Sequence, residues 1–223
     1  MALVLNIETA TTNCSVSLSK DGETLVLKED NSLGYSHAET LHLFIDEVFK
    51  TAKIKPSEID AVAVSKGPGS YTGLRIGVSS AKGLCFALNK PLIAISTLES
   101  LACQVKTDDG FIVPMLDARR MEVYAAIYNS NLELEREIKA EILTEESYMS
   151  ILETNKVYFI GSGVTKAKAL IQHPNAVFID GKLPSANEMS SLAEIKYKKS
   201  DTEDVAYFEP YYLKDFVALK KKA

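Results

Sequence analysis

The chain has 223 residues, with 25 lysines and arginines against 30 aspartates and glutamates, and so carries a net charge of −5 at pH 7. Its 46% hydrophobic and 25% charged residues are typical of a folded globular protein and exclude a fibrous repeat or a fully disordered chain. The acidic balance disfavours nucleic-acid binding by this chain alone, since dense phosphate contacts need a basic surface.

The N-terminal segment and the cysteines indicate a cytoplasmic protein. The first residues have no basic region, and they reach Asn6 and Glu8 before an apolar run of signal length forms. No uninterrupted apolar stretch is long enough to span a bilayer, so we expect no membrane partner. Cys14, Cys85 and Cys103 form no CxxC pair, which predicts neither a disulfide framework nor a structural zinc site.

Hydrophobic periodicity divides the chain into two halves with the same order of elements, which is strand, strand, strand, helix, strand, helix, strand. In the first half these elements are predicted at 3–7, 15–19, 24–29, 36–52, 61–64, 70–88 and 91–95, and the Ser-x-x-Glu pattern at 36–39 is typical of a capping box at the start of the first helix. In the second half they are predicted at 112–116, 123–128, 134–142, 144–152, 157–160, 165–171 and 177–179, and a last helix begins near Ser185.

The repeated order predicts an α/β fold of two pseudo-duplicated βββαβαβ subdomains. This double unit is the plan of the ribonuclease H-like, actin-like ATPase superfamily, with mixed sheets covered by helices. We expect residues 1–102 to form the first subdomain, with the C-terminal segment 203–223 packing back against it. Residues 103–202 are expected to form the second subdomain.

A glycine-rich stretch at 66–77 reads Lys-Gly-Pro-Gly-Ser-Tyr-Thr-Gly-Leu-Arg-Ile-Gly and joins a strand to a helix. Backbone N–H groups at such a helix start can hold an anion, yet the spacing is neither a P-loop nor a dinucleotide fingerprint. Close packing is the favoured interpretation, with Gly73 and Gly77 allowing another helix to approach. A neighbouring stripe of the same helix carries three further small residues: Ser79, Gly83 and Ala87.

Five segments together resemble a known family. They are Leu-Asn-Ile-Glu-Thr at 5–9, the glycine-rich stretch 67–77, Pro-Leu-Ile-Ala-Ile-Ser-Thr-Leu-Glu at 91–99, the segment 116–124 with Leu-Asp-Ala-Arg-Arg and Glu-Val-Tyr, and Pro-Tyr-Tyr-Leu-Lys at 210–214. This set resembles the TsaB-type dimerisation subunits of the machinery that attaches threonylcarbamoyl to the adenosine beside the tRNA anticodon. The segments span nearly the whole chain.

The resemblance implies a non-catalytic scaffold subunit. Such a chain forms a homodimer and also docks to the metal-dependent catalytic transferase subunit, which it activates. It helps to recruit an accessory ATPase subunit to the assembled pair, and it reaches tRNA only indirectly. ATP and a metal ion are expected in the partner subunits, with no cofactor bound by this chain alone.

The chain departs from its catalytic relatives at the metal site. In the transferase subunit, as the resemblance implies, a His-x-x-x-His pair just after the fifth strand binds a metal, because residues four apart share one helical face. Here the corresponding positions are Thr97 and Leu101. The histidines at 37, 42 and 173 do not replace the pair, so we expect neither a metal site nor catalytic residues.

Nucleotide binding is weakened by a second departure. Actin-like ATPases usually carry Asp-x-Gly at the first hairpin, where this chain has Glu8 followed by a threonine and Ala10. A methyl group at residue 10 hinders the close approach of a phosphate to the backbone. Gly161 and Gly163 follow a strand at the place where such folds hold adenosine. The candidate nucleotide-binding residues, a weak prediction, are Glu8, Gly161 and Gly163.

A surplus of apolar residues on the first helix, together with the small-residue stripes of the second, predicts a partner surface built from both helices. Two such helices can form a four-helix bundle with the same helices of a similar protein. The candidate partner-binding residues are Leu41, Ile45, Val48, Phe49, Gly73, Arg75, Gly77 and Ser80. A charge at Ile45 or Gly77 is expected to abolish association without unfolding the chain; the alternative is that the surplus covers the protein's own sheet.

Other interpretations stay open at this point. Arg119 and Arg120 fit either an exposed salt-bridged pair beside Asp117 or a contact with an acidic partner or tRNA. The lysine-rich tail 214–222 fits a solvated terminus or a segment near tRNA. Two other functions are a metalloprotease-like hydrolase, from the wider family, and a small-molecule kinase or ATPase, from the fold alone.

Overall fold

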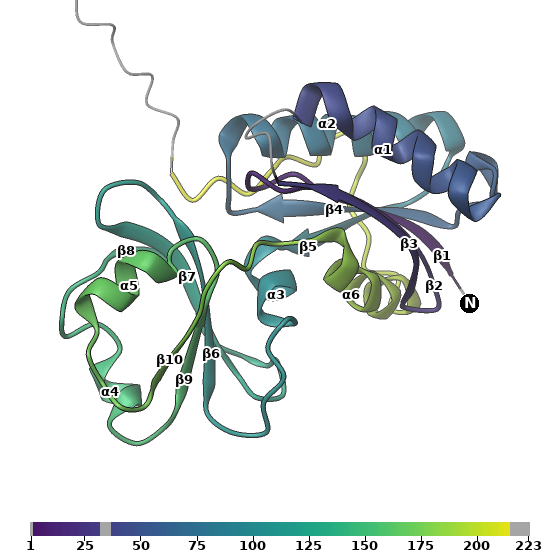
Figure 1. The fold of residues 1–223 in the computed structure, drawn as a ribbon. Helices are drawn as coiled ribbons and strands as arrows, with labels where there is room; N and C mark the ends of the chain where they lie inside the picture. The colour runs from purple at the N-terminus through teal and green to yellow at the C-terminus, as the bar shows by residue number, and fades with distance from the viewer. Residues whose placement is uncertain (1, 32–36, 215–223) are drawn as a thin grey trace, which may run out of the picture.

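The structure is a computed structural model that describes residues 2–31 and 37–214 (Figure 1). The first half contains β1 (Leu3–Glu8), β2 (Cys14–Lys20), β3 (Glu23–Asp30), α1 (His37–Ala52), η1 (Pro56–Glu58), β4 (Ala61–Gly67), α2 (Tyr71–Leu88), β5 (Leu92–Ser96) and α3 (Thr97–Ala102). The second contains β6 (Phe111–Asp117), β7 (Glu122–Asn129), β8 (Leu134–Ile142), α4 (Met149–Leu152), β9 (Val157–Ile160), α5 (Val164–Leu170), β10 (Ala176–Ile179) and α6 (Ala186–Lys198).

The two halves form two five-stranded sheets with the same topology. The strand orders are β3-β2-β1-β4-β5 and β8-β7-β6-β9-β10. In each sheet the first three strands pair antiparallel and the last two add in parallel, as helical crossovers require. This repetition confirms the predicted α/β fold of two actin-like βββαβαβ units.

The first sheet is covered on both faces because its central strands are apolar on both sides. In β1, Leu5 and Ile7 belong to a core with α1 and α2, whereas Val4 points to the opposite face and packs with Met189 of α6. This alternation follows from the period of two in a strand. Figure 1 shows α1 and α2 on one side of this sheet and α6 on the other.

The helix that ends each half packs on the sheet of the other half. Leu98 and Leu101 of α3 lie in a core cluster with Ile112 and Leu116 of the second sheet. Helix α6 packs instead on the first sheet, although residue order had grouped it with 103–202. The position of each of these helices along the chain therefore does not show which sheet it covers. The domain boundaries themselves stay a prediction.

Three short elements differ from the sequence expectations. Residues 144–148 form turns rather than the start of the helix predicted at 144–152, and Tyr148 has a φ of 65° just before α4. The Tyr148 hydroxyl donates to Glu141 near the end of β8, and Glu141 also pairs with Arg136 at 2.5 Å. These contacts to β8 hold the turn before α4 in place. Helices α3 and η1 were not predicted, because six and three residues are too short for a helical period.

The C-terminal segment 203–214, called the strap below, runs back along the first half. The Glu203 N–H donates to the Leu92 carbonyl at 2.8 Å and extends the edge of the sheet beside β5. Lys82 Nζ of α2 donates to the Phe208 carbonyl at 2.8 Å. The Tyr211 N–H donates to the Lys66 carbonyl at 2.7 Å, and residues 215–223 lie outside the described part of the chain.

Within 2–31 and 37–214, no helix combines the length and the apolar character that crossing a bilayer requires.

Candidate functional site

Four apolar residues expected at a partner surface lie in the core instead. Leu41 and Val48 of α1 are fully buried, and Ile45 and Phe49 are only 8% and 5% exposed. All four pack with β1, β2 and α2 in one cluster. Their helical spacing marked the side of α1 that faces the sheet, so the alternative interpretation, cover for the protein's own sheet, is correct for these residues.

Gly73 and Gly77 are explained by a close approach within the chain. A Cβ at Gly73 would lie 2.1 Å from the Thr9 carbonyl oxygen, and one at Gly77 would lie 2.2 Å from Thr9 Oγ1. The same Oγ1 donates to the Gly73 carbonyl at 2.8 Å. The closest neighbour of both glycines is thus Thr9 in the turn after β1, while His37 at the start of α1 would lie 3.3 Å from a Cβ at Gly73. A charge at Ile45 or Gly77 is therefore expected to disrupt the fold itself, which argues against the prediction of an intact monomer.

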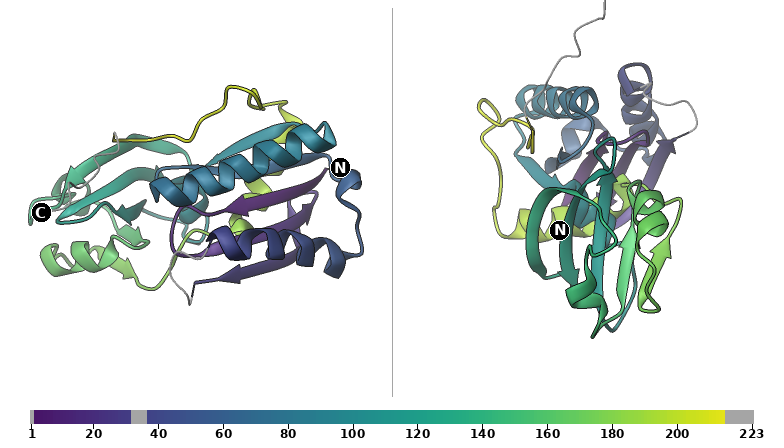
Figure 2. Two further views of the ribbon diagram at one scale, coloured as in Figure 1. Left: turned by 90° about the horizontal axis from the view of Figure 1, so that it is seen from above. Right: turned by 90° about the vertical axis from the view of Figure 1, so that its left-hand side faces the viewer.

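The sides of α1 and α2 that point away from the sheet form a continuous surface, called the outer helix face below. The two helices run side by side on the same sheet face (Figure 2), and Ser80 Oγ lies 3.4 Å from His42 Nε2. Two large apolar side chains are exposed there, Leu43 at 60% and Phe86 at 85%. The face comprises Leu43, Arg75, Ser79, Ser80, Gly83, Phe86 and Ala87.

Gly83 differs from the other two glycines of α2. A Cβ added at this position would meet no atom within 4 Å. An exposed glycine in a helix interior costs about 1 kcal/mol relative to alanine, and nothing in the described chain offsets that cost. Among the residues predicted at the partner surface, only Arg75 and Ser80 lie on the outer helix face. The sequence interpretation noted the stripe containing Gly83 and counted Leu43 in the apolar surplus of α1 without naming it as a partner-binding residue, and it missed Phe86.

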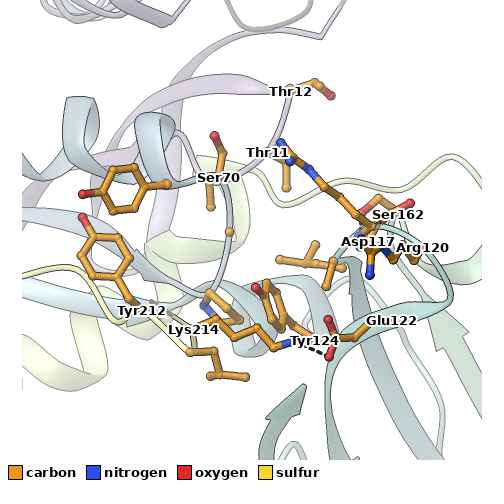
Figure 3. A pocket seen from close by; sticks show the side chains of 18 of the residues that line it. Thr11, Thr12, Ser70, Asp117, Arg120, Glu122, Tyr124, Ser162, Tyr212 and Lys214 are labelled. Carbon is orange, nitrogen blue, oxygen red and sulfur yellow. Dashed lines mark hydrogen bonds and ion pairs between the residues drawn. The ribbon is translucent and has the colours of Figure 1, made fainter. Parts of the chain in front are cut away.

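A cleft of about 1340 Å³ separates the two halves (Figure 3). Its first wall is the turn 10–12 after β1 together with the start of α2. Its second wall is the β6–β7 hairpin, residues 116–124, and the strap closes one side with residues 211–214. Tyr71 of α2 stacks against Tyr212 of the strap at 4.9 Å between ring centroids, and Lys214 pairs with Glu122 at 2.5 Å.

Four of the backbone donors around this cleft have partners within the chain. On the first wall, the Ala10 N–H donates to Glu8 Oε1 at 2.6 Å and the Ser70 N–H donates to the Ala10 carbonyl at 2.7 Å. On the second wall, the Asp117 N–H donates to Ser162 Oγ at 3.0 Å and the Arg119 N–H to Asp117 Oδ1 at 2.6 Å. These four N–H groups are therefore engaged within the chain and do not face a ligand unpaired.

The candidate nucleotide residues are not grouped around the cleft. Glu8 is fully buried beneath the first turn. Gly161 has a φ of +111°, and a Cβ there would lie 2.3 Å from the Met115 carbonyl; a Cβ at Gly163 would lie 2.9 Å from Val123 Cγ1. Both glycines thus let the turn after β9 pack against β6 and β7, and nucleotide binding by them stays a weak prediction.

The positions that correspond to the metal-binding histidines lie in packed structure. Thr97 is fully buried with its Oγ1 2.7 Å from Ser65 Oγ, and Leu101 is fully buried against the second sheet. Neither side chain is a metal ligand of the imidazole type. Over the described ranges, no three His, Cys, Asp or Glu side chains come together as a metal site would require.

The charged residues at the cleft divide into paired and unpaired groups. Asp117 pairs with Lys166 at 2.7 Å and Glu122 pairs with Lys214 at 2.5 Å. Arg119 and Arg120 are exposed, and their guanidinium groups make no ion pair within the described residues. The salt-bridged interpretation of this arginine pair is therefore wrong.

Replacing Glu8 with glutamine should stabilise the protein most at alkaline pH. Burial raises the pKa of Glu8 from an ordinary 4.5 to about 7, although hydrogen bonds from the Ala10 and Thr9 N–H groups and the Ser65 hydroxyl lower it. Because the folded pKa is the higher one, this carboxyl favours folding most below pH 4.5 and loses that contribution as the pH rises to 7.

Glu8→Gln keeps an acceptor for Ala10 but carries no charge. Its gain in unfolding free energy over the native chain should grow between pH 4.5 and 7 to about 3 kcal/mol. Urea denaturation at a series of pH values measures it, with Glu23→Gln on the exposed side of β3 as the matched control. An equal gain at pH 4.5 and pH 8 would contradict the assignment.

Comparison with known proteins agrees with this fold. A family model described as TsaD, tRNA N6-adenosine threonylcarbamoyltransferase, matches residues 33–222. The tRNA threonylcarbamoyladenosine biosynthesis protein TsaB of Escherichia coli is 32% identical over 98% of this chain and 97% of its own length. The chain belongs to the TsaB family. The corresponding protein of Haemophilus influenzae is 28% identical over 98% of this TsaB-family chain and 96% of its own length.

A solved structure supports the same assignment. It is described as an uncharacterized protein from Pseudomonas aeruginosa with similarity to peptidase YeaZ, and it matches this TsaB-family chain with a TM-score of 0.82. The identity is 27%, and the match covers 96% of this chain and 100% of that one. The similarity to transferases is more local: the enzyme of Jannaschia sp. is 44% identical over 36% of this chain and 23% of its own length.

Proposed function

We propose that this chain is a non-catalytic subunit in the biosynthesis of threonylcarbamoyladenosine in tRNA, and that it binds the catalytic transferase subunit through the outer helix face. The observation that carries the proposal is Gly83, a glycine of α2 with open space above it, on the surface that also exposes the side chains of Phe86 and Leu43. The names of its TsaB relatives supply the pathway.

The chemistry of the outer helix face suits a second pair of helices. Ser79, Gly83 and Ala87 lie four residues apart, so a partner helix can approach the α2 backbone closely along this stripe. Phe86 and Leu43 supply apolar area that water now covers, and large aromatic anchors dominate many interfaces. A bundle of four helices would bury both side chains.

The proposed role needs no catalytic group on this chain. Thr97 and Leu101 stand where the transferase would carry two imidazoles, so the metal and its chemistry belong to the partner subunit in this proposal. ATP is likewise assigned to partner subunits. A second copy of this chain would use the same face, so that the homodimer competes with the heterodimer. The assembled pair then recruits the accessory ATPase and reaches tRNA through the partner, in the cytoplasm.

Reconstitution of tRNA threonylcarbamoylation with and without this chain tests the proposal. Omission should lower the modification rate at least tenfold, and addition of the purified chain should restore it. The purified chain alone should turn over neither ATP nor a peptide substrate. Unchanged modification on omission would refute the subunit role, and metal-dependent turnover by the chain alone would favour a kinase or hydrolase.

A further inference from the structure

We propose that the cleft between the two halves is a second docking site, which takes an extended acidic segment with apolar side chains from a protein partner. This site adjoins one end of the outer helix face, where Arg75 donates to the Tyr71 hydroxyl at 3.1 Å, and it does not depend on the docking proposed there. Arg119 and Arg120 would pair with carboxylates of the segment, while the apolar and tyrosine side chains of the cleft would cover the rest of it.

The first argument is charge. Every other charged side chain that lines the cleft is paired, since Asp117 contacts Lys166 and Glu122 contacts Lys214. The two guanidinium groups of Arg119 and Arg120 are left without a carboxylate among the described residues. The α2 helix begins at the facing wall with no acidic residue in its first turn, so its N-terminal end adds positive potential. The unbalanced charge in the cleft is therefore positive.

The second argument is the size and lining of the cleft. Its volume of about 1340 Å³ exceeds the roughly 300–1,000 Å³ of ordinary small-molecule pockets. Four tyrosines reach the cleft along with the two arginines, and tyrosine and arginine are enriched in the centres of protein interfaces. Much of the remaining lining is apolar, as at Pro68, Leu116 and Met121. The tyrosines are Tyr71, Tyr124, Tyr211 and Tyr212.

The lining also favours a peptide over the two other anionic classes. A nucleotide needs several free backbone donors for its phosphates, and four N–H groups at this cleft, those of Ala10, Ser70, Asp117 and Arg119, are engaged within the chain. A nucleic acid strand needs a run of cationic contacts along its backbone, whereas this cleft offers two unpaired arginines in a chain of net charge −5. A peptide whose carboxylates are spaced by apolar side chains matches both the two unpaired arginines and the apolar lining of the cleft.

The conformation of the arginines agrees with a binding role. Arg119 and Arg120 have φ values of 70° and 51°, so two consecutive side chains with a Cβ adopt the left-handed region. Glycine or asparagine would adopt it at lower cost. The chain thus keeps two guanidinium groups at this hairpin tip at the expense of its own stability.

Fluorescence anisotropy with defined probes tests the proposal. The probe is a fluorescent dodecapeptide that repeats glutamate, leucine and serine, and the purified full chain should bind it more weakly as salt is raised. A peptide with glycine for leucine should bind at least fivefold more weakly, and one with lysine for glutamate should not bind. Mg-ATP and a uridine oligonucleotide of similar length should not compete.

The variant Arg119→Asn/Arg120→Gly separates binding from folding. It should raise the dissociation constant for the acidic peptide at least tenfold. It should also raise Tm by about 2–4 °C, because the new residues suit the left-handed conformation. The control is Lys20→Glu, at the end of β2 that is farther along the chain from the turn 10–12. Its dissociation constant for the acidic peptide should stay within twofold of the native value. Failure of the acidic peptide to bind, equal binding by the arginine variant, or competition by ATP or RNA would overturn the proposal.

Discussion

The Gly73→Ala variant should lose about 3 kcal/mol of unfolding free energy, although alanine is the better helix former. The new Cβ would lie 2.1 Å from the Thr9 carbonyl oxygen, a separation that real Cβ atoms essentially never show. Neither side can yield easily, because Thr9 Oγ1 also donates to the Gly73 carbonyl and the Ser70 N–H donates to Ala10. Overpacking of this kind typically costs 1–3 kcal/mol.

Gly83→Ala is the matched control on the same helix. Its Cβ would meet no atom within 4 Å, so the variant should gain up to about 1 kcal/mol. Urea denaturation followed by circular dichroism measures both variants under one set of conditions. Equal effects of the two substitutions would contradict the packing assigned to Gly73.

Gly83→Leu should leave the chain folded but weaken its association with the transferase subunit at least about 100-fold. The position is open in the free chain, and leucine is a good helix former, so the free protein should be as stable as the native one. In the complex, the isobutyl group would fill the space through which a partner helix approaches the α2 backbone. An overpacking cost of about 3 kcal/mol corresponds to that loss of affinity.

Titration calorimetry with the transferase subunit and light scattering of the chain alone measure the hetero- and homodimer. Ser191→Leu, an exposed position of α6 on the opposite side of the first sheet, is the control and should bind normally. Gly83→Leu should also fail to restore modification in the reconstituted reaction. Normal association of this variant would remove the outer helix face as the docking surface, whereas a folding defect in it would contradict the open position of Gly83.

Most of the fold was predictable because its elements have strong periods. Strands such as β1 and β4 alternate or run apolar between turn residues, and α1 and α2 are long enough to show a helical repeat. The packing of α3 and α6 was not predictable in this way. A helix is attracted to whichever apolar sheet face lacks cover, and that face here belongs to the other half of the chain.

The partner surface was predicted on the correct pair of helices but with mostly the wrong residues, if the outer helix face is the docking surface. Apolar residues at helical spacing, such as Leu41 and Val48, mark the core side of a surface helix. Residues that bind a partner fall outside that period, as Leu43 and Phe86 do. A search for helical periodicity therefore finds the core residues of a helix and overlooks the exposed apolar side chains of an interface.

Glycine posed a different difficulty, since its presence shows only that space is needed. Thr9 occupies the space beside Gly73 and Gly77, whereas the space beside Gly83 is empty. The three glycines nevertheless look alike in a sequence. The cleft was missed for a related reason. Its walls come from the first turn, the β6–β7 hairpin and the strap, which are about 90 to 200 residues apart along the chain.

The reciprocal packing of α3 and α6 makes the two halves inseparable in a practical sense. A fragment ending at residue 102 would lack α6 and would expose Val4, Ala63 and Ile93 to water. A fragment beginning there would lose α3 and would uncover Ile112. Split-protein fragments cut at this point would therefore have to be coexpressed and would complement each other, because each carries the helix that finishes the other's core.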